Sequence, residues 1–327
     1  MEGKVKTAVK VLVGAGAALS VLDAINRLTV RRARGRLSKM RYGDSEWAVH
    51  SFPSRYGIVR YKKAGRGAPL LLLHGLDSQA GLLEWDANIF ALSEHFTVYS
   101  LEFPGFGFSE KPRITYSAYL LATVVTDFLA NVVKGSAYVA ASGSASGVCL
   151  GAHLLAPAYF RRLILISPTG DGDVTLPAKR AVKAMLRLPI IGTSVYNALH
   201  SGFRALALAH IMHDPQSPWI SDYADHRRLP VYFNPKGARH LIISTLSRHL
   251  NTDLGHLLKN ADLPIHIVWG NNDSLNPTAN FKPLAAAAKR RLTLTTFKNS
   301  KSYPHQDEPN EFVRVCQWFF GQVKSRD

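Results

Sequence analysis

Cysteine is scarce in this chain, and metal-binding patterns are missing from it. The 327 residues include only Cys149 and Cys316, which lie far apart in sequence and in apolar surroundings. They exclude a disulfide framework and indicate core positions in a reducing compartment. No group of cysteines and histidines has the spacing of zinc ligands, so we expect neither a metal nor a cofactor. Internal repeats and low-complexity tracts are also missing, which excludes repeat architectures.

Acidic residues are few, and the resulting positive charge is unevenly distributed. The chain has 40 Lys and Arg against 23 Asp and Glu, a formal net charge of +17. Between Arg27 and Arg41 there are seven cations and no acidic residue. Such a block favours an anionic partner, either a nucleic acid or an acidic membrane surface, although a solvated arm would look the same. With 46% apolar residues, the chain as a whole has a globular composition.

Residues 1–45 differ from the rest of the chain and form the first predicted unit. An uncharged apolar run from Val11 to Leu22 is preceded by three lysines and followed by the basic block. The run is shorter than the roughly 20 residues that span a bilayer. A secretory signal or a packing helix would also fit, but a short apolar helix beside cations suits an anionic membrane surface better. We therefore expect an intracellular protein that binds such a surface peripherally through residues 1–41. Nucleic acid is disfavoured because the block lacks aromatic residues for base stacking.

Strand-like runs alternate with helix-like segments in two parts of the chain. Runs rich in leucine, isoleucine and valine, bounded by glycine or proline, predict strands buried on both faces. The predicted strands lie within residues 49–61, 68–75, 96–101, 162–168, 263–270 and 292–297 and in the run that begins at Ala137. Their alternation with helices predicts a mostly parallel twisted sheet flanked by helices. The segment 171–260 has helix-like runs interrupted by prolines and is predicted to form a helical insertion over the sheet.

The stretch Ser142-Gly-Ser-Ala-Ser-Gly147 has the composition of a sharp turn from a strand into a helix. Only residues with small side chains fit around such a turn, which presents the nucleophile in serine hydrolases. Two registers remain open. If Ser144 is at the apex, a nucleophile is present. If Gly143 is at the apex, which agrees better with the interval to Pro157, there is none.

Several short motifs, each weak alone, occur in one characteristic order. They are Leu72-Leu-His74-Gly75, Phe103-Pro-Gly-Phe-Gly-Phe-Ser109, the small-residue turn, Ile166-Ser-Pro168, Val268-Trp-Gly-Asn-Asn-Asp273 and Pro304-His-Gln-Asp-Glu-Pro309. Together they resemble the α/β-hydrolase superfamily from about Trp47 to the end of the chain. The resemblance implies an α/β-hydrolase core of residues 46–170 plus 261–327, a helical cap of residues 171–260, and the amino-terminal arm.

The resemblance also implies roles for individual residues. Gly270-Asn-Asn-Asp273 matches the pattern that carries the acid of the catalytic triad, so Asp273 is the expected orienting carboxylate. Backbone N–H groups would stabilise the developing oxyanion. The expected donors are Leu76 and, if Ser144 is the nucleophile, Ala145.

The histidine departs from the family pattern. When Pro304 and Pro309 are aligned with the family motif, Lys301 and Ser302 stand where Gly-His is usual. His305 lies three residues further on, about one helical turn away. A general base must come within hydrogen-bond reach of its nucleophile, so this displacement puts the proton relay in doubt.

Two functions are therefore expected as alternatives. In the first, the chain is an enzyme: Ser144, Asp273 and His305 hydrolyse an ester or lipid, or the site carries out a related non-hydrolytic reaction. The apolar substrate lies between cap and sheet near a membrane. In the second, the chain is a catalytically inactive binding or scaffold protein that keeps the pocket. A serine without a base is a weak nucleophile, and the members of a triad act as a unit.

Overall fold

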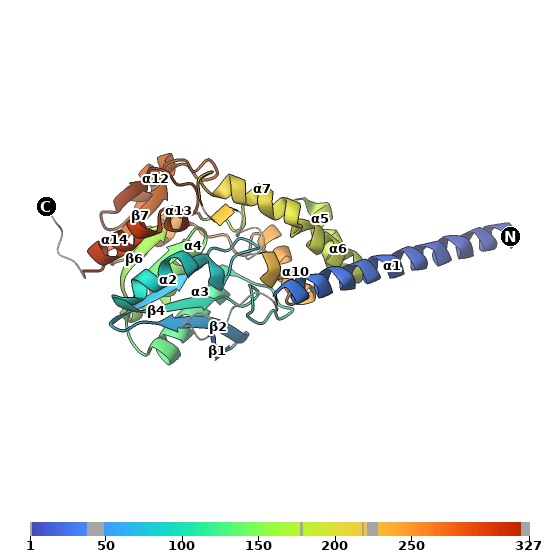
Figure 1. Ribbon diagram of the computed structural model, residues 1–327, viewed down its shortest axis with the longest axis horizontal. Coiled ribbons are helices and arrows are strands. Elements are labelled where there is room, and N and C mark those ends of the chain that lie inside the picture. Colours follow the sequence, from blue (N-terminus) through green and yellow to red (C-terminus); the bar gives the residue numbers. More distant parts are fainter. Residues whose placement is uncertain (1, 38–48, 177–178, 218, 221–227, 322–327) are drawn as a thin grey trace.

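A computed structural model describes residues 2–37, 49–176, 179–217, 219–220 and 228–321. Within these residues the strands form one eight-stranded sheet with the order β1-β2-β4-β3-β5-β6-β7-β8 (Figure 1). The strands are β1 (Val49–Ser54), β2 (Gly57–Ala64), β3 (Ala68–Leu73), β4 (Phe96–Glu102), β5 (Ala137–Ser142), β6 (Phe160–Ile166), β7 (Ile265–Gly270) and β8 (Thr293–Phe297). Strands β1 and β2 pair antiparallel, β2 pairs antiparallel with β4, and all other pairs are parallel.

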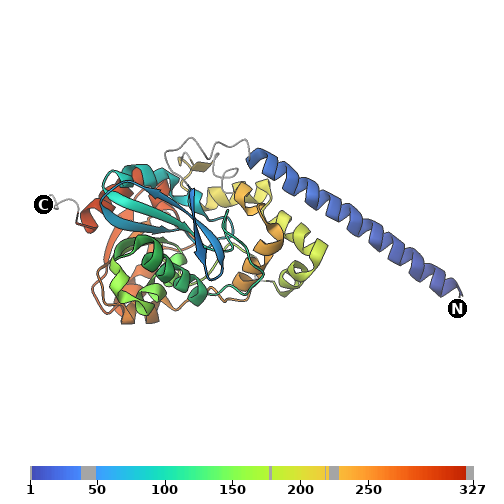
Figure 2. The same ribbon diagram turned by 90° about the horizontal axis from the view of Figure 1, so that it is seen from below.

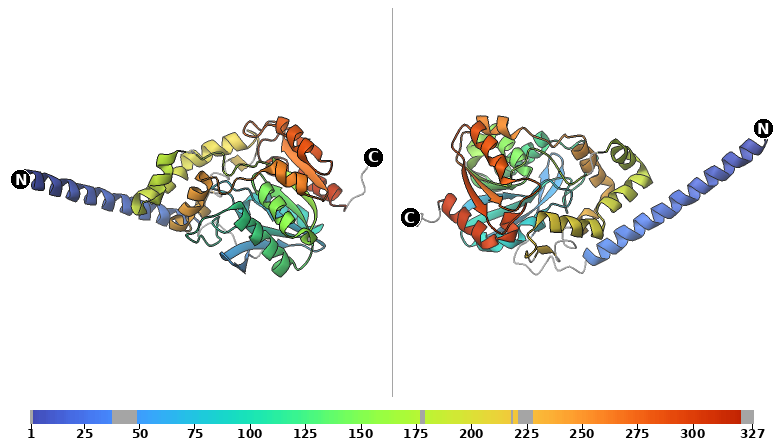
Figure 3. Two further views of the ribbon diagram at one scale, coloured as in Figure 1. Left: turned by 180° about the vertical axis from the view of Figure 1, so that it is seen from behind. Right: turned by 90° about the horizontal axis from the view of Figure 1, so that it is seen from above.

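Helices cover both faces of the sheet. They are α2 (Asp86–Ser93), α3 (Ala118–Phe128), α4 (Ala145–Leu155), α11 (Leu254–Asn260), α12 (Phe281–Ala287), α13 (Pro304–Asp307) and α14 (Pro309–Phe319). Between β6 and β7 lie α5 (Arg180–Arg187), α6 (Pro189–Leu199), α7 (Gly202–Met212), α9 (Arg228–Val231) and α10 (Pro235–Leu246), which form a cap beside the sheet (Figures 1 and 3). A mostly parallel sheet with flanking helices confirms the predicted fold class. The boundary expected at residue 45 and the start expected at Trp47 lie outside the described residues.

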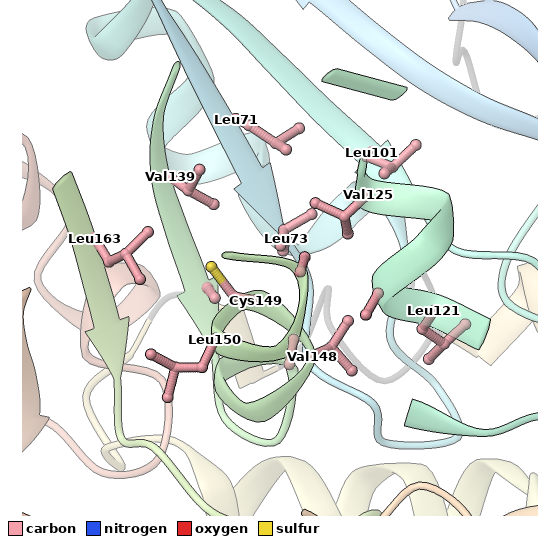
Figure 4. Close-up of a cluster of buried hydrophobic side chains, with 14 of the residues drawn as sticks. Leu71, Leu73, Leu101, Leu121, Val125, Val139, Val148, Cys149, Leu150 and Leu163 are labelled. Carbon is pink, nitrogen blue, oxygen red and sulfur yellow. The ribbon is translucent and has the colours of Figure 1, made fainter. Parts of the chain in front are cut away.

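The leucine run of β3 shows why the sheet is buried on both faces. Successive side chains of a strand point to opposite faces. Leu71 and Leu73 pack with α3 and α4 (Figure 4), and Leu70 and Leu72 pack with α2 and α14. Cys149 packs on the same face of the sheet as Leu71 and Leu73, and Cys316 packs on the opposite face. Both cysteines are free and buried. Burial raises the pKa of both thiols, as expected for core positions.

The amino-terminal segment forms one helix, α1 (Glu2–Leu37), that projects from the body (Figure 2). Its second half packs on the cap, where Val30 and Ala33 join a cluster of apolar side chains from α6, α9 and α10. Asn26 is buried there and donates hydrogen bonds to Ile190 O at 3.3 Å and to Ser194 Oγ at 3.0 Å. By length and composition, Val13–Arg36 could cross a membrane. The helix is thus longer than the apolar run from which the sequence predicted it.

Candidate functional site

The turn between β5 and α4 has glycine at its apex. β5 ends at Ser142, and Ser144 already has helical angles (φ −70°, ψ −15°) directly before α4. Gly143 lies between them with φ +53°, a conformation that side chains of L-residues rarely adopt. A Cβ atom added there would meet nothing within 4 Å, so the side-chain position at the apex is open space. Of the two registers that the sequence left open, the structure has the one without a nucleophile at the apex.

A cavity of about 70 Å³ lies at this turn. Its lining comes from the carboxyl ends of β3, β5, β6 and β7, the position at which parallel α/β sheets bind ligands. The lining includes Gly75, Leu76, Asp77, Ser142, Gly143, Ser144, Asp173, Val174, Met212, Asp273, Leu275, Ser302 and Tyr303. The structure therefore brings together three of the expected site residues, Leu76, Ser144 and Asp273. His305 does not line this cavity.

Asp273 is held in place by three hydrogen bonds, and the side chain that donates one of them is a serine. Its Oδ1 accepts hydrogen bonds from the backbone N–H groups of Leu275 and Asn276, each at 3.0 Å, and from Ser302 Oγ at 2.9 Å. Among the described residues, Oδ2 has no hydrogen-bond partner. Burial raises the pKa of Asp273, and the three hydrogen bonds partly oppose that shift. A hydroxyl thus occupies the place that an imidazole takes in a triad.

His305 lies on α13, away from Asp273 and among the side chains beneath α2. Its ring packs on Trp85 with 4.6 Å between centroids. Its Nε2 is 3.6 Å from Glu84 Oε1, too far for a hydrogen bond, and neither ring nitrogen has a hydrogen-bond partner within the described part of the chain. α13 begins at Pro304, and its first turn directs His305 toward Trp85 and Phe312 in the core. The expected arrangement of Ser144, Asp273 and His305 is not assembled.

The loop that presents Ser302 is tied to the cap by Asp307. The Asp307 carboxylate accepts a hydrogen bond from the backbone N–H of Lys301 at 3.2 Å and lies 2.8 Å from His213 Nδ1. The His213 ring stacks on Tyr303 with 5.1 Å between centroids. These contacts fix Lys301 and Ser302 at the positions where the family has Gly-His.

Two backbone N–H groups at the cavity remain available to a ligand. Leu76 and Ser144 both line the cavity, and the structure as described gives neither of their N–H groups an acceptor. With the apex at Gly143, the N–H that follows it belongs to Ser144 rather than to Ala145, the donor expected from the sequence. The Ser144 N–H also lies at the amino end of α4, where the helix dipole favours a partial negative charge.

Two further carboxylates at the cavity were missed from the sequence. Tyr303 Oη donates to Asp77 Oδ2 at 2.5 Å, and the backbone N–H of Ser78 donates to Asp173 Oδ2 at 2.7 Å. Burial and the neighbouring Asp77 raise the pKa of Asp173. Asp77 lies two residues beyond the predicted strand 68–75, and Asp173 lies five residues beyond the predicted strand 162–168. Their positions after the carboxyl ends of strands could have identified them.

Comparisons with known proteins agree with this geometry. A family model described as "Alpha/beta hydrolase family" matches residues 70–315. An uncharacterized protein of Mycobacterium tuberculosis is 26% identical over 277 residues, which cover 82% of this chain and 80% of that protein. The solved structure of a bacterial membrane phospholipase A covers 99% of this chain and 100% of its own, with a TM-score of 0.70 and 20% identity. A serine hydrolase involved in carbazole degradation covers 85% of this chain and 100% of its own, with a TM-score of 0.70 and 16% identity. At these identities the two structures show a shared fold.

Proposed function

This chain belongs to the alpha/beta hydrolase family, and the turn between β5 and α4, which we call the elbow, has Gly143 at its apex in place of a nucleophile. We therefore propose that the protein binds a small ligand without cleaving it. The superfamily resemblance inferred from the motifs is confirmed by the family match. The proposal depends on one observation above all: glycine stands at the apex while Ser302 holds Asp273.

The chemistry of a serine hydrolase needs two groups that are missing from this arrangement. The nucleophile must be activated, because a serine hydroxyl is almost fully protonated at neutral pH. Ser302 has no basic nitrogen with which to accept that proton. Loss of a single triad member removes most of the catalytic rate, since the members act together. A turn with glycine at the apex and serine at the base position therefore supports binding without covalent catalysis.

The lining of the cavity indicates the class of ligand. The N–H groups of Leu76 and Ser144 can donate to a carbonyl oxygen. Val174, Met212 and Leu275 supply apolar surface for an attached chain. The carboxylates of Asp77, Asp173 and Asp273 disfavour an anion. We propose a small, neutral carbonyl compound with an apolar chain, in the same chemical class as an ester or lipid substrate.

Ester hydrolysis by Ser144 is the second candidate. One observation favours it: Ser144 and Asp273 line the same cavity, beside the Leu76 N–H group. In this scheme the Ser144 oxygen bonds to the ester carbonyl carbon, and the alcohol leaves with the hydroxyl proton. Water then releases the acid and restores Ser144. Among the described residues, no imidazole lines the cavity to carry that proton. The two candidates predict opposite results for a serine-directed reagent.

A fluorophosphonate probe and p-nitrophenyl butyrate separate the candidates. For a binding protein we expect no labelling of the full chain and the same background turnover in wild type and Ser144→Ala. The neutral ketone 2-octanone should raise the melting temperature of the wild type. Val174→Trp, which fills the cavity, should abolish that rise, and Val174→Ala should retain it. Stoichiometric labelling that Ser144→Ala removes would instead establish the hydrolase.

We also propose that α1 anchors the protein in a membrane, on the side of a reducing compartment. Exposed apolar side chains at Val11, Val13, Leu19, Val21 and Leu22 support this location. At 100° per residue they point to all sides of the helix, which suits insertion along the helix axis better than the flat interfacial position expected from the sequence. The free thiols of the core agree with a reducing environment.

Flotation with neutral phosphatidylcholine vesicles tests the anchor. The full chain should float, whereas Val13→Asp/Leu19→Asp should stay at the bottom of the gradient, because each carboxylate costs about 2.5–3.5 kcal/mol in the apolar layer. A matched variant with the same changes at exposed positions of the body, Phe90→Asp/Tyr119→Asp, should float like the wild type. Equal flotation of all three proteins would rule out insertion of α1.

A further inference from the structure

A second, larger cavity lies between α1 and the cap. It has a volume of about 730 Å³ and is lined by seven cationic side chains and one carboxylate. Arg27, Arg31 and Arg34 come from α1, and Arg187, Lys236 and Arg239 come from the cap. Arg113, from the loop before α3, completes the set. Segments from three distant parts of the sequence thus converge on one strongly positive cavity.

Among the described residues, carboxylates neutralise little of this charge. Asp23, the one carboxylate of the lining, pairs with Arg27 at 2.6 Å. In the part of the chain that the structure describes, no carboxylate pairs with Arg31, Arg113 or Arg187. Burial and the nearby Arg113 lower the pKa of Arg239. The cavity therefore carries cationic repulsion that a bound anion would relieve.

The cavity is built from side chains that are held in place. Arg239 is 8% exposed, and its Nη1 donates to Leu188 O at 2.5 Å and to Pro189 O at 3.1 Å. Its buried Nε has no hydrogen-bond partner among the described residues. Arg34 Nη2 donates to Phe233 O at 2.7 Å, which ties α1 to the cap at this point. An anchored guanidinium with an unused donor suits a phosphate, which accepts several hydrogen bonds in a fixed geometry.

The position of the cavity along α1 indicates where such an anion would come from. The exposed apolar part of α1 ends at Ile25 and Leu28, and the arginine-rich part begins at Arg27. A helix inserted up to Leu28 would hold the cavity at the level of lipid headgroups. We propose that this cavity binds the headgroup of an anionic lipid that carries more than one phosphate group.

This site is separate from the cavity at the elbow, because the two share no lining residue. The assignment of the ligand as phosphate rests on the cationic lining alone. Only the assignment of its source as a lipid also uses the membrane anchor proposed above. Failure of either proposal can therefore be recognised independently.

Calorimetric titration of the full chain in dodecyl maltoside tests the proposal. The probes are dioctanoyl phosphatidylinositol 4-phosphate, its free headgroup inositol 1,4-bisphosphate, and dioctanoyl phosphatidylserine. We expect the first lipid to bind at least about tenfold more tightly than phosphatidylserine, because its second phosphate can use additional arginines. Weaker binding of the free headgroup identifies the lipid as the ligand, and equal binding identifies a soluble phosphate compound of the same chemistry.

Two triple variants show whether the binding belongs to this cavity. Arg31→Gln/Arg113→Gln/Arg187→Gln should bind the phosphoinositide on the order of 100-fold more weakly. Its melting temperature should not fall, since these exposed side chains have no carboxylate partner in the described structure. Lys282→Gln/Arg291→Gln/Lys298→Gln removes the same charge around α12 and β8, far from α1 (Figure 3), and should bind like the wild type. Equal losses in the two variants, no loss in the first, or no binding of any phosphate probe to the wild type would overturn the proposal.

Discussion

The two cavities of this protein are built in different ways, and the charged side chains that line them are of opposite sign. The cavity at the elbow is defined by the backbone: a glycine turn, two N–H groups and the ends of parallel strands, with three carboxylates around them. The cavity beside α1 is defined by long cationic side chains on helices from distant parts of the sequence. The first has glycine at the apex of its turn and Ser302 hydrogen-bonded to Asp273. The lining of the second comes from α1, the cap and the loop before α3, and none of it from the strands of the sheet.

The largest expected effect comes from returning reactive side chains to the elbow. Gly143→Ser/Ser302→His places a hydroxyl in the open space at the apex and an imidazole beside Asp273. We expect p-nitrophenyl butyrate turnover to rise on the order of 10²–10³-fold over wild type, since the donors and the acid are already present. Each single variant should remain at background. If the double variant is no faster than the singles, the elbow does not keep the geometry of an active site.

The next largest effect is expected on stability, from a change at Gly270 beside the loop that carries Ser302. A Cβ atom at Gly270, the last residue of β7, would collide with the carbonyl oxygens of Lys301 and Ser300. Gly270→Ala should therefore reduce the free energy of unfolding by about 3 kcal/mol, because the loop that carries Ser302 must move. Chemical denaturation measures this loss. Gly135→Ala, where a Cβ would meet nothing within 4 Å, is the control and should change stability by about 0.5 kcal/mol or less.

A smaller effect concerns the acid of the elbow. Because the pKa of Asp273 is raised in the folded state, the protein loses stability as the pH rises from 3.8 through the folded-state value. Asparagine keeps the Oδ1 acceptor and cannot ionise, so Asp273→Asn should be more stable than wild type at pH 7, by about 1 kcal/mol. The difference should vanish below about pH 3.8. Melting curves at pH 3.5 and pH 7 measure this difference. A variant less stable than wild type at pH 7 would show that the hydrogen bonds to the Asp273 carboxylate outweigh the cost of its burial.

The smallest effect belongs to the cationic cavity. Burial, Arg239 and Arg113 together lower the pKa of His240, which lines this cavity. Arg113→Gln should move the pKa of His240 back toward 6.5 without loss of stability. An NMR titration of the His240 ring follows this shift. The equivalent change at Arg55, which pairs with Asp127 elsewhere, is the control and should leave the His240 titration unchanged.

The sequence predicted those features that depend on short, local patterns. Apolar runs bounded by glycine or proline predicted the strands. A Gly-x-x-Asp motif at the end of β7, interpreted through the family resemblance, predicted Asp273 as a site residue, and Asp273 lines the cavity. The register of the turn could not be decided, because Gly143 and Ser144 are adjacent and both are flanked by small residues. The interval to Pro157 favoured Gly143, but the sequence does not give the backbone angle (φ +53°) that identifies the apex.

Features that depend on contacts between residues far apart in sequence could not be predicted from the sequence. The hydrogen bond between Tyr303 and Asp77 joins residues 226 positions apart. The inward direction of His305 depends on a core pocket formed by Trp85 and Phe312, which no motif describes. The apolar run did not give the full length of α1, because alanine and arginine also favour helices and extend it to Leu37.

The attachment of α1 to α6 and α9 has a mechanical consequence. Helix α1 has 36 residues and is about 54 Å long. Its carboxyl-terminal part packs against the cap. In the membrane-anchored arrangement proposed above, a change in the tilt of α1 would turn α6 and α9, the cap helices that it contacts, in the same direction. The angle of α1 and the position of this part of the cap are therefore linked.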